Sequence, residues 1–174
     1  MITLVCGPMF SGKTTQLLVY ERRSLIAKQK VVYIKHSADN RYSFDKVVIN
    51  HDGSKSSESV PVVSTTKLMD CFDVVKDFDV ILIEEGQFFP DLFSFCESLL
   101  NKSIVISALS GDYKRKPFQP VTEILGLCDK IVHLCATCVC CGKDAPFTKR
   151  LTSNTDQILI GGKDSYEPRC GSCF

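Results

Sequence analysis

Apolar and polar positions alternate along the chain in two different periods. Short apolar runs at residues 2–5, 31–34, 80–83 and 103–109 predict β-strands. Residues 14–27 are rich in Leu, Gln, Glu and Arg, and residues 91–100 carry apolar side chains at helical spacing, so both segments predict helices. The run at 80–83 is apolar at every position, which is typical of a central parallel strand buried on both faces. The alternation predicts an α/β fold, a parallel sheet flanked by helices.

Two stretches interrupt this pattern. Residues 37–59 are polar and contain several serines, which predicts a mobile loop or an irregular hairpin. After residue 133 the chain becomes rich in cysteine and glycine, with short β-like pieces. We therefore expect a nucleotide-binding α/β domain over residues 1–133 and a small C-terminal domain over residues 134–174. Hydrophobic residues make up 44% and charged residues 24% of the 174, as in ordinary globular proteins.

The first predicted strand leads into a phosphate-binding pattern, LVCGPMFSGKTTQLL. Gly7 and Gly12 allow a tight turn whose backbone N–H groups point at phosphate oxygens. Lys13 supplies a positive charge to the β- and γ-phosphates, and the Thr14 hydroxyl suits Mg²⁺. The pattern lies between a strand and a helix, as a phosphate loop requires. The predicted ATP contacts in this loop are Gly7, Pro8, Met9, Phe10, Ser11, Gly12, Lys13 and Thr14.

Two carboxylates follow the apolar run at 80–83. Glu84 stands at the tip of this predicted strand, where phosphate-loop enzymes hold Mg²⁺, usually through water, on a neighbouring strand. Glu85 comes next and could take a proton from an attacking hydroxyl. Gly86, Gln87 and the two phenylalanines after them offer an amide and an aromatic surface for a flat base. Water as the acceptor, which would make the protein an ATPase, and a merely solvated strand end remain alternatives.

Ten cysteines and no basic leader before the first strand suggest a cytosolic chain in which thiols stay reduced. Cys138 and Cys141 form one C-x-x-C pair, and Cys170 and Cys173 form a second, a spacing typical of structural zinc sites. Cys135 with Cys138 is a competing first pair. Gly142, directly after Cys141, favours the register 138/141, since a tight knuckle accepts glycine best there. Buried or redox-active cysteines are the alternative.

Net charge narrows the classes of partner. The formal charge is +1, which offers little attraction to nucleic acid or to acidic membranes, and no apolar run is long enough to span a bilayer. We therefore expect neither nucleic acid nor membrane as a partner. Two other classes stay open from the residues alone: a nucleic-acid-stimulated ATPase with a zinc ribbon, and a non-catalytic nucleotide sensor.

Four motifs in this order, GPMFSGKT, IEEGQFFPD, ALSGDYKRKPF and IGGKDSY, resemble those of the type II thymidine kinase family, the cytosolic and poxvirus-like enzymes. The likeness extends over nearly the whole chain. It implies a RecA-like phosphate-loop domain followed by a small zinc-binding lasso domain. It also implies transfer of the γ-phosphate of ATP to the 5′-hydroxyl of thymidine, acceptance of deoxyuridine, inhibition by dTTP and a homotetramer.

The resemblance also assigns roles to residues. It makes Glu85 the general base, with Lys13 as the second catalytic residue, and Thr14 and Glu84 the Mg²⁺ site. Around the phosphates it adds Asp39, Asn40, Arg41, Glu84, Glu85, Gly86 and Gln87 to the loop. The nucleoside would contact Met9, Tyr113, Phe118, Gln157, Ile158, Leu159, Ile160, Gly161 and Tyr166, the last six forming a lasso around the base. The zinc ligands would be Cys138, Cys141, Cys170 and Cys173.

Two positions depart from the family pattern, which commonly has Asp at Glu84 and Phe at Tyr113. The extra methylene changes the geometry toward a metal-bound water, and the phenol hydroxyl requires a partner and could alter base preference. From the residues alone, ILIGGKDSY would be a β-hairpin with a Gly-Gly turn. The lasso role of this segment comes from the resemblance.

Overall fold

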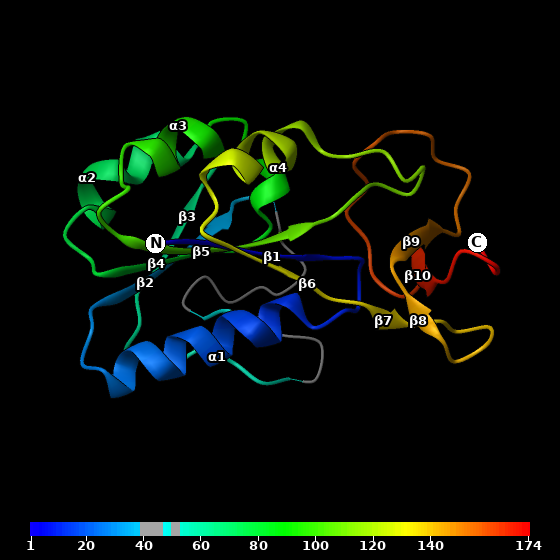
Figure 1. Ribbon diagram of the computed structural model, residues 1–174, viewed down its shortest axis with the longest axis horizontal. Helices are drawn as coiled ribbons and strands as arrows, with labels where there is room; N and C mark the ends of the chain where they lie inside the picture. The colour runs from blue at the N-terminus through cyan, green and yellow to red at the C-terminus, as the bar shows by residue number, and fades with distance from the viewer. Residues whose placement is uncertain (39–46, 50–52) are drawn as a thin grey trace.

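The computed structural model describes residues 1–38, 47–49 and 53–174 (Figure 1). Its centre is a parallel sheet in the order β3-β2-β4-β5-β1-β6. The strands are β1 (Ile2–Gly7), β2 (Val31–His36), β3 (Val62–Thr65), β4 (Val80–Ile83), β5 (Ser103–Leu109) and β6 (Lys130–His133). All five neighbouring pairs are parallel, so the carboxyl ends of the strands lie at one edge of the sheet. Ligands of such sheets bind at that edge.

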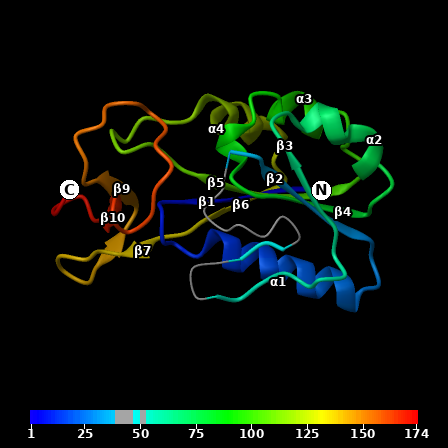
Figure 2. The ribbon, with the colours of Figure 1, turned by 180° about the vertical axis from the view of Figure 1, so that it is seen from behind.

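Helices cover both faces of the sheet. Helix α1 (Lys13–Ile26) lies on one face, and α2 (Phe72–Val75), α3 (Leu92–Glu97) and α4 (Gln119–Ile124) lie on the other (Figures 1 and 2). Short 3₁₀ turns η1 (Leu68–Cys71), η2 (Gly86–Phe88) and η3 (Leu125–Leu127) precede or follow these helices or strands. The predicted α/β fold with a parallel sheet flanked by helices is confirmed.

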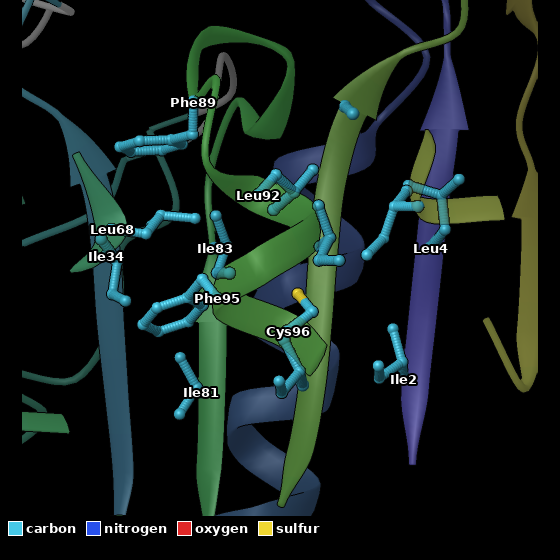
Figure 3. Packing of buried hydrophobic residues seen from close by; sticks show 14 of the residues in the cluster. Ile2, Leu4, Ile34, Leu68, Ile81, Ile83, Phe89, Leu92, Phe95 and Cys96 are labelled. Atoms are coloured by element: carbon cyan, nitrogen blue, oxygen red, sulfur yellow. The ribbon is translucent and has the colours of Figure 1, made fainter. Parts of the chain in front are cut away.

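Two apolar cores, one on each face, hold the layers together. On the α3 side, Leu92, Phe95 and Cys96 pack over alternate strand residues such as Ile81 and Ile83, as Figure 3 shows. On the α1 side, the core consists of Val5, Leu17, Leu18, Val31, Tyr33, Val48, Val60, Val80, Leu82 and Val105. Because both faces are covered, every residue of β4 is buried, which explains its continuous apolar run.

The predicted strands at 2–5, 31–34, 80–83 and 103–109 are confirmed, with the first two running on to Gly7 and His36. The predicted helices are confirmed as α1 and as the shorter α3. Strands β3 and β6 and helices α2 and α4 were not predicted. Each is short, and β6 is an edge strand with mainly exposed residues, so its apolar signal is weak. In the polar stretch 37–59, the described residues contain one antiparallel bridge, between Ile49 and Lys55.

The chain after β6 forms two small antiparallel pairs at one end of the sheet (Figure 1). Strand β7 (Ala136–Thr137) pairs with β8 (Asp144–Ala145), and β9 (Phe147–Arg150) pairs with β10 (Tyr166–Arg169). The hairpin expected around the Gly-Gly pair is wrong: residues 151–165 form a loop without strands, here called the β9–β10 loop. The domain boundary at residue 133 stays a prediction.

Within the described part of the chain, no helix combines the length and the apolar character needed to cross a bilayer.

Candidate active site

The phosphate loop connects β1 to α1 at the carboxyl edge of the sheet. Gly12 has φ +84°, a left-handed conformation that glycine adopts without a steric penalty, and the first helical turn begins directly after it. The Lys13 side chain is buried, and its Nζ donates a 2.7 Å hydrogen bond to the Pro8 carbonyl inside the loop. The loop therefore presents the start of α1, with its positive dipole end, to a phosphate.

Thr14 and Glu84, the predicted Mg²⁺ pair, lie close together. Thr14 belongs to the segment that follows β1, Glu84 follows β4, and β5 lies between these two strands. The expectation that the carboxylate stands on a strand next to β1 is therefore wrong. The Thr14 Oγ1 donates a 3.0 Å hydrogen bond to Glu84 Oε1. A hydroxyl and a carboxylate at this distance are hard oxygen donors of the kind that Mg²⁺ prefers. The longer Glu84 side chain thus reaches the phosphate loop, and the donor set fits a magnesium site.

Glu85 stands directly after Glu84 in a left-handed backbone conformation, with φ +53° and ψ +50°. Such a conformation costs a non-glycine residue about 1–2 kcal/mol and is frequent at functional sites. The carboxylate accepts a 2.6 Å hydrogen bond from the buried Gln87 Nε2, while Gln87 Oε1 accepts from the Leu109 N–H at 3.0 Å. Gln87 therefore fixes the orientation of the Glu85 side chain against the end of β5.

A cavity that is partly open to solvent lies beside Glu85. All nine residues predicted to contact a nucleoside line it, from the phosphate loop, the segment between β5 and α4, the β9–β10 loop and the start of β10. Those residues are Met9, Tyr113, Phe118, Gln157, Ile158, Leu159, Ile160, Gly161 and Tyr166. Glu85 and Gln87 line the same cavity, so the candidate base faces the space that these residues enclose.

Sequence reasoning missed several residues of this cavity wall, above all Arg150 and Asp112. Both are buried polar side chains. Arg150 follows Thr148 by two positions in β9, so alternation along the strand puts both on the same buried face. That alternation is the one signal in the sequence that could have indicated an inward-facing arginine.

Thr148 joins the phosphate loop to the chain after β6. Its Oγ1 accepts a 2.9 Å hydrogen bond from the Met9 backbone N–H, and both groups are buried. We expect Thr148→Val to destabilise the fold by about 1–3 kcal/mol, because the Met9 donor would remain buried without this acceptor. Urea unfolding would measure the loss. Thr66→Val, at an exposed threonine, is the control and should change stability by less than about 0.5 kcal/mol. Equal stability of the two variants would contradict the assignment.

The four predicted cysteines come together after β7 and β10. The sulfur atoms of Cys138, Cys141, Cys170 and Cys173 all lie within 4.8 Å of one another. Tetrahedral zinc with bonds of about 2.3 Å separates its sulfur ligands by about 3.8 Å, so the cluster fits this ion. Gly142 has φ +72°, as the register 138/141 requires, and Cys135 is not part of the cluster.

The pKa values of these thiols are shifted in opposite directions. Backbone N–H groups, first that of Cys170, lower the pKa of Cys138 to about 6, toward the thiolate that binds metals. The hydrogen-bonded side chain of Cys170 raises the pKa of Cys173 to about 12. With its pKa at about 12 the Cys173 thiol keeps its proton at neutral pH, so ionisation of all four sulfurs would require a positive ion between them.

Asp39, Asn40 and Arg41, predicted to contact phosphate, lie outside the described residues.

Gly86 and Gln87 belong to η2, which comes immediately after the candidate base. Gly86 leaves no room for a side chain, because a Cβ there would lie 2.6 Å from Ile106 Cγ2. The tight turn thus keeps η2 packed against β5.

Known proteins match this chain over nearly its whole length. A family model described as "Thymidine kinase" matches residues 1–174. The thymidine kinases of raccoon poxvirus, monkeypox virus and vaccinia virus (strain Western Reserve) are each 42% identical over 175 aligned residues, covering 99% of this chain and 96% of theirs. This chain therefore belongs to the thymidine kinase family.

Proposed function

We propose that the protein transfers the γ-phosphate of ATP to the 5′-hydroxyl of thymidine. The triphosphate lies along residues 7–14 and the nucleoside occupies the cavity beside Glu85. Glu85 accepts the proton of the 5′-hydroxyl as its oxygen forms the new bond to the γ-phosphorus, and ADP leaves with the electrons of the broken bond. Lys13 exchanges its bond to the Pro8 carbonyl for the phosphate oxygens and offsets their charge.

One observation supports this proposal most. Met9 of the phosphate loop, Glu85 and the predicted nucleoside contacts border the same cavity, so a base, a sugar and a triphosphate have adjacent places. A carboxylate held by Gln87 in a strained backbone conformation is the orientation that a general base requires. An ATPase would have no use for a cavity with these walls.

Thr14 and Glu84 would hold Mg²⁺, which neutralises charge on the β- and γ-phosphate oxygens when bound. The four cysteines would hold a structural zinc ion, because four protein ligands leave no position for water. The resemblance further implies that deoxyuridine is accepted, that dTTP inhibits, that the enzyme is a cytoplasmic homotetramer serving nucleotide salvage, and that Asp39, Asn40 and Arg41 contact phosphate.

Incubation with γ-labelled ATP, MgCl₂ and each nucleoside in turn tests the proposal. We expect label in thymidine monophosphate, with less or none in purine nucleosides. Label that appears only as inorganic phosphate, or that appears faster with DNA or RNA than with thymidine, would contradict it and favour the ATPase class. Absence of any product would favour the nucleotide sensor.

A further inference from the structure

Tyr113 is one of the two departures from the family pattern, and its hydroxyl is hydrogen-bonded within the protein. Its Oη donates a 2.8 Å hydrogen bond to the Thr155 carbonyl in the β9–β10 loop. A phenol has a single hydrogen to donate, so this donor is already engaged and is not offered to a base in the cavity. The hydroxyl therefore ties the turn after β5 to a loop 42 residues further along the chain.

The ring of Tyr113 lies against the Arg150 guanidinium, whose Cζ is 3.8 Å from the ring centroid. A guanidinium this close to an aromatic face is held by a cation–π contact. The next residue back in the turn adds a second tie, because the Asp112 Oδ2 accepts a 3.2 Å hydrogen bond from Gln157 Nε2. The turn after β5 is thus hydrogen-bonded to the β9–β10 loop at residues 155 and 157.

Arg150 holds the same loop from inside. Its guanidinium donates to the carbonyls of Asn154 at 3.1 Å and Gln157 at 3.2 Å, and also to the Asp156 carbonyl. It donates further to the Tyr166 hydroxyl at 2.7 Å, which in turn donates to the Leu159 carbonyl at 2.7 Å. Because a planar guanidinium has its donors in a rigid arrangement, the path of this backbone is set by one buried side chain.

We propose that Tyr113 and Arg150 form a latch that holds the β9–β10 loop over the cavity before a nucleoside binds. The Tyr113 hydroxyl is then a positioning group that strengthens binding of every accepted nucleoside to the same degree and does not read the base. This inference rests on the proposed function for its kinetic readout, whereas the state of the loop can be measured without substrate. Ordering the loop in advance reduces the entropy that each nucleoside must overcome on binding.

The test is Tyr113→Phe, which keeps the ring on Arg150 and removes only the hydroxyl. We expect KM for thymidine and for deoxyuridine to rise by the same factor, about 2- to 10-fold, the effect of one lost hydrogen bond. The loss should appear in KM and not in kcat, because the latch acts on bound substrate and transition state alike. Amide hydrogen exchange in residues 152–159 of the nucleoside-free protein should become faster by a similar factor.

Tyr20→Phe, in α1 and outside the cavity wall, is the matched control and should leave both measurements unchanged. Three results would overturn the latch: a change of more than about threefold in the thymidine-to-deoxyuridine preference, unchanged KM, or unchanged exchange. If the unmodified protein phosphorylates no nucleoside, the proposed function fails, and the exchange measurement still decides the latch.

Arg150→Lys gives a second variant that keeps the charge but loses the fork of donors. We expect faster exchange over a longer stretch of the loop than in Tyr113→Phe, since several carbonyls lose their donor at once. In the double variant the fall in kcat/KM should be smaller than the product of the two single effects, because the two residues act on one loop. Independent, multiplying effects would contradict a shared latch.

Discussion

Glu85→Gln is expected to lower kcat for thymidine by about 10²-fold or more while ATP affinity stays close to that of the unmodified enzyme. The amide has the shape of the carboxylate and can still accept the hydrogen bond from Gln87, so the left-handed turn after β4 should persist. It has no basicity with which to take the proton of the 5′-hydroxyl. Turnover would be followed with γ-labelled ATP, and ATP binding by calorimetry.

Glu97→Gln is the control, because it neutralises an exposed carboxylate at the end of α3 and should leave turnover unchanged. Near-normal turnover of Glu85→Gln would remove Glu85 from the role of base. A loss of ATP affinity equal to the loss of turnover would assign Glu85 to the phosphate or metal site instead.

Cys141→Ser is expected to reduce bound zinc from about one ion per chain to almost none and to lower kcat/KM for thymidine by at least about 10-fold. Tyr166, in β10, lies four residues before Cys170, and β10 pairs with β9, which carries Thr148 and Arg150. Loss of the ion would loosen this end of the molecule and, with it, one wall of the cavity. Metal analysis and steady-state kinetics measure the two effects.

Cys135→Ser separates the two possible registers. In the structure Cys135 is exposed and outside the cluster, so this variant should keep its zinc and its activity. The opposite result, with zinc retained in Cys141→Ser and lost in Cys135→Ser, would show that the competing C-x-x-C pair binds the ion.

Local patterns predicted the parts of the fold whose partners are near in sequence or whose burial is complete. The residues of β4 are all apolar because helices cover both faces of the sheet. Helix α1 was predictable because it starts directly after the phosphate loop. The same holds for the cysteine cluster, whose spacing and Gly142 indicate the register directly. Strands β3 and β6 and helices α2 and α4 were not predicted because each is short and carries few buried residues.

The hairpin that the residues alone suggest for part of the β9–β10 loop is wrong for a different reason, whereas the lasso implied by the resemblance stays a prediction. A hairpin over residues 158–166 would need the Leu159 carbonyl for its ladder, but this carbonyl accepts a hydrogen bond from the Tyr166 hydroxyl. The carbonyls of Asn154, Asp156 and Gln157, just before that segment, accept hydrogen bonds from Arg150. These donors are side chains several residues away, and no alternation within the loop reports them. Gly162 opens a turn, closed by the Ser165 N–H on the Gly162 carbonyl, but this turn does not join two paired strands.

The hydrogen bond between Met9 and Thr148 joins the proposed ATP site to the proposed nucleoside site. If a bound phosphate tightens the backbone around Met9, we expect β9 to become more rigid as well, and a nucleoside that makes β9 more rigid should tighten the loop in return. Such coupling is reciprocal, so each substrate should raise the affinity for the other by an equal factor. Synergy between the binding of the two substrates would then depend on a single backbone amide, that of Met9.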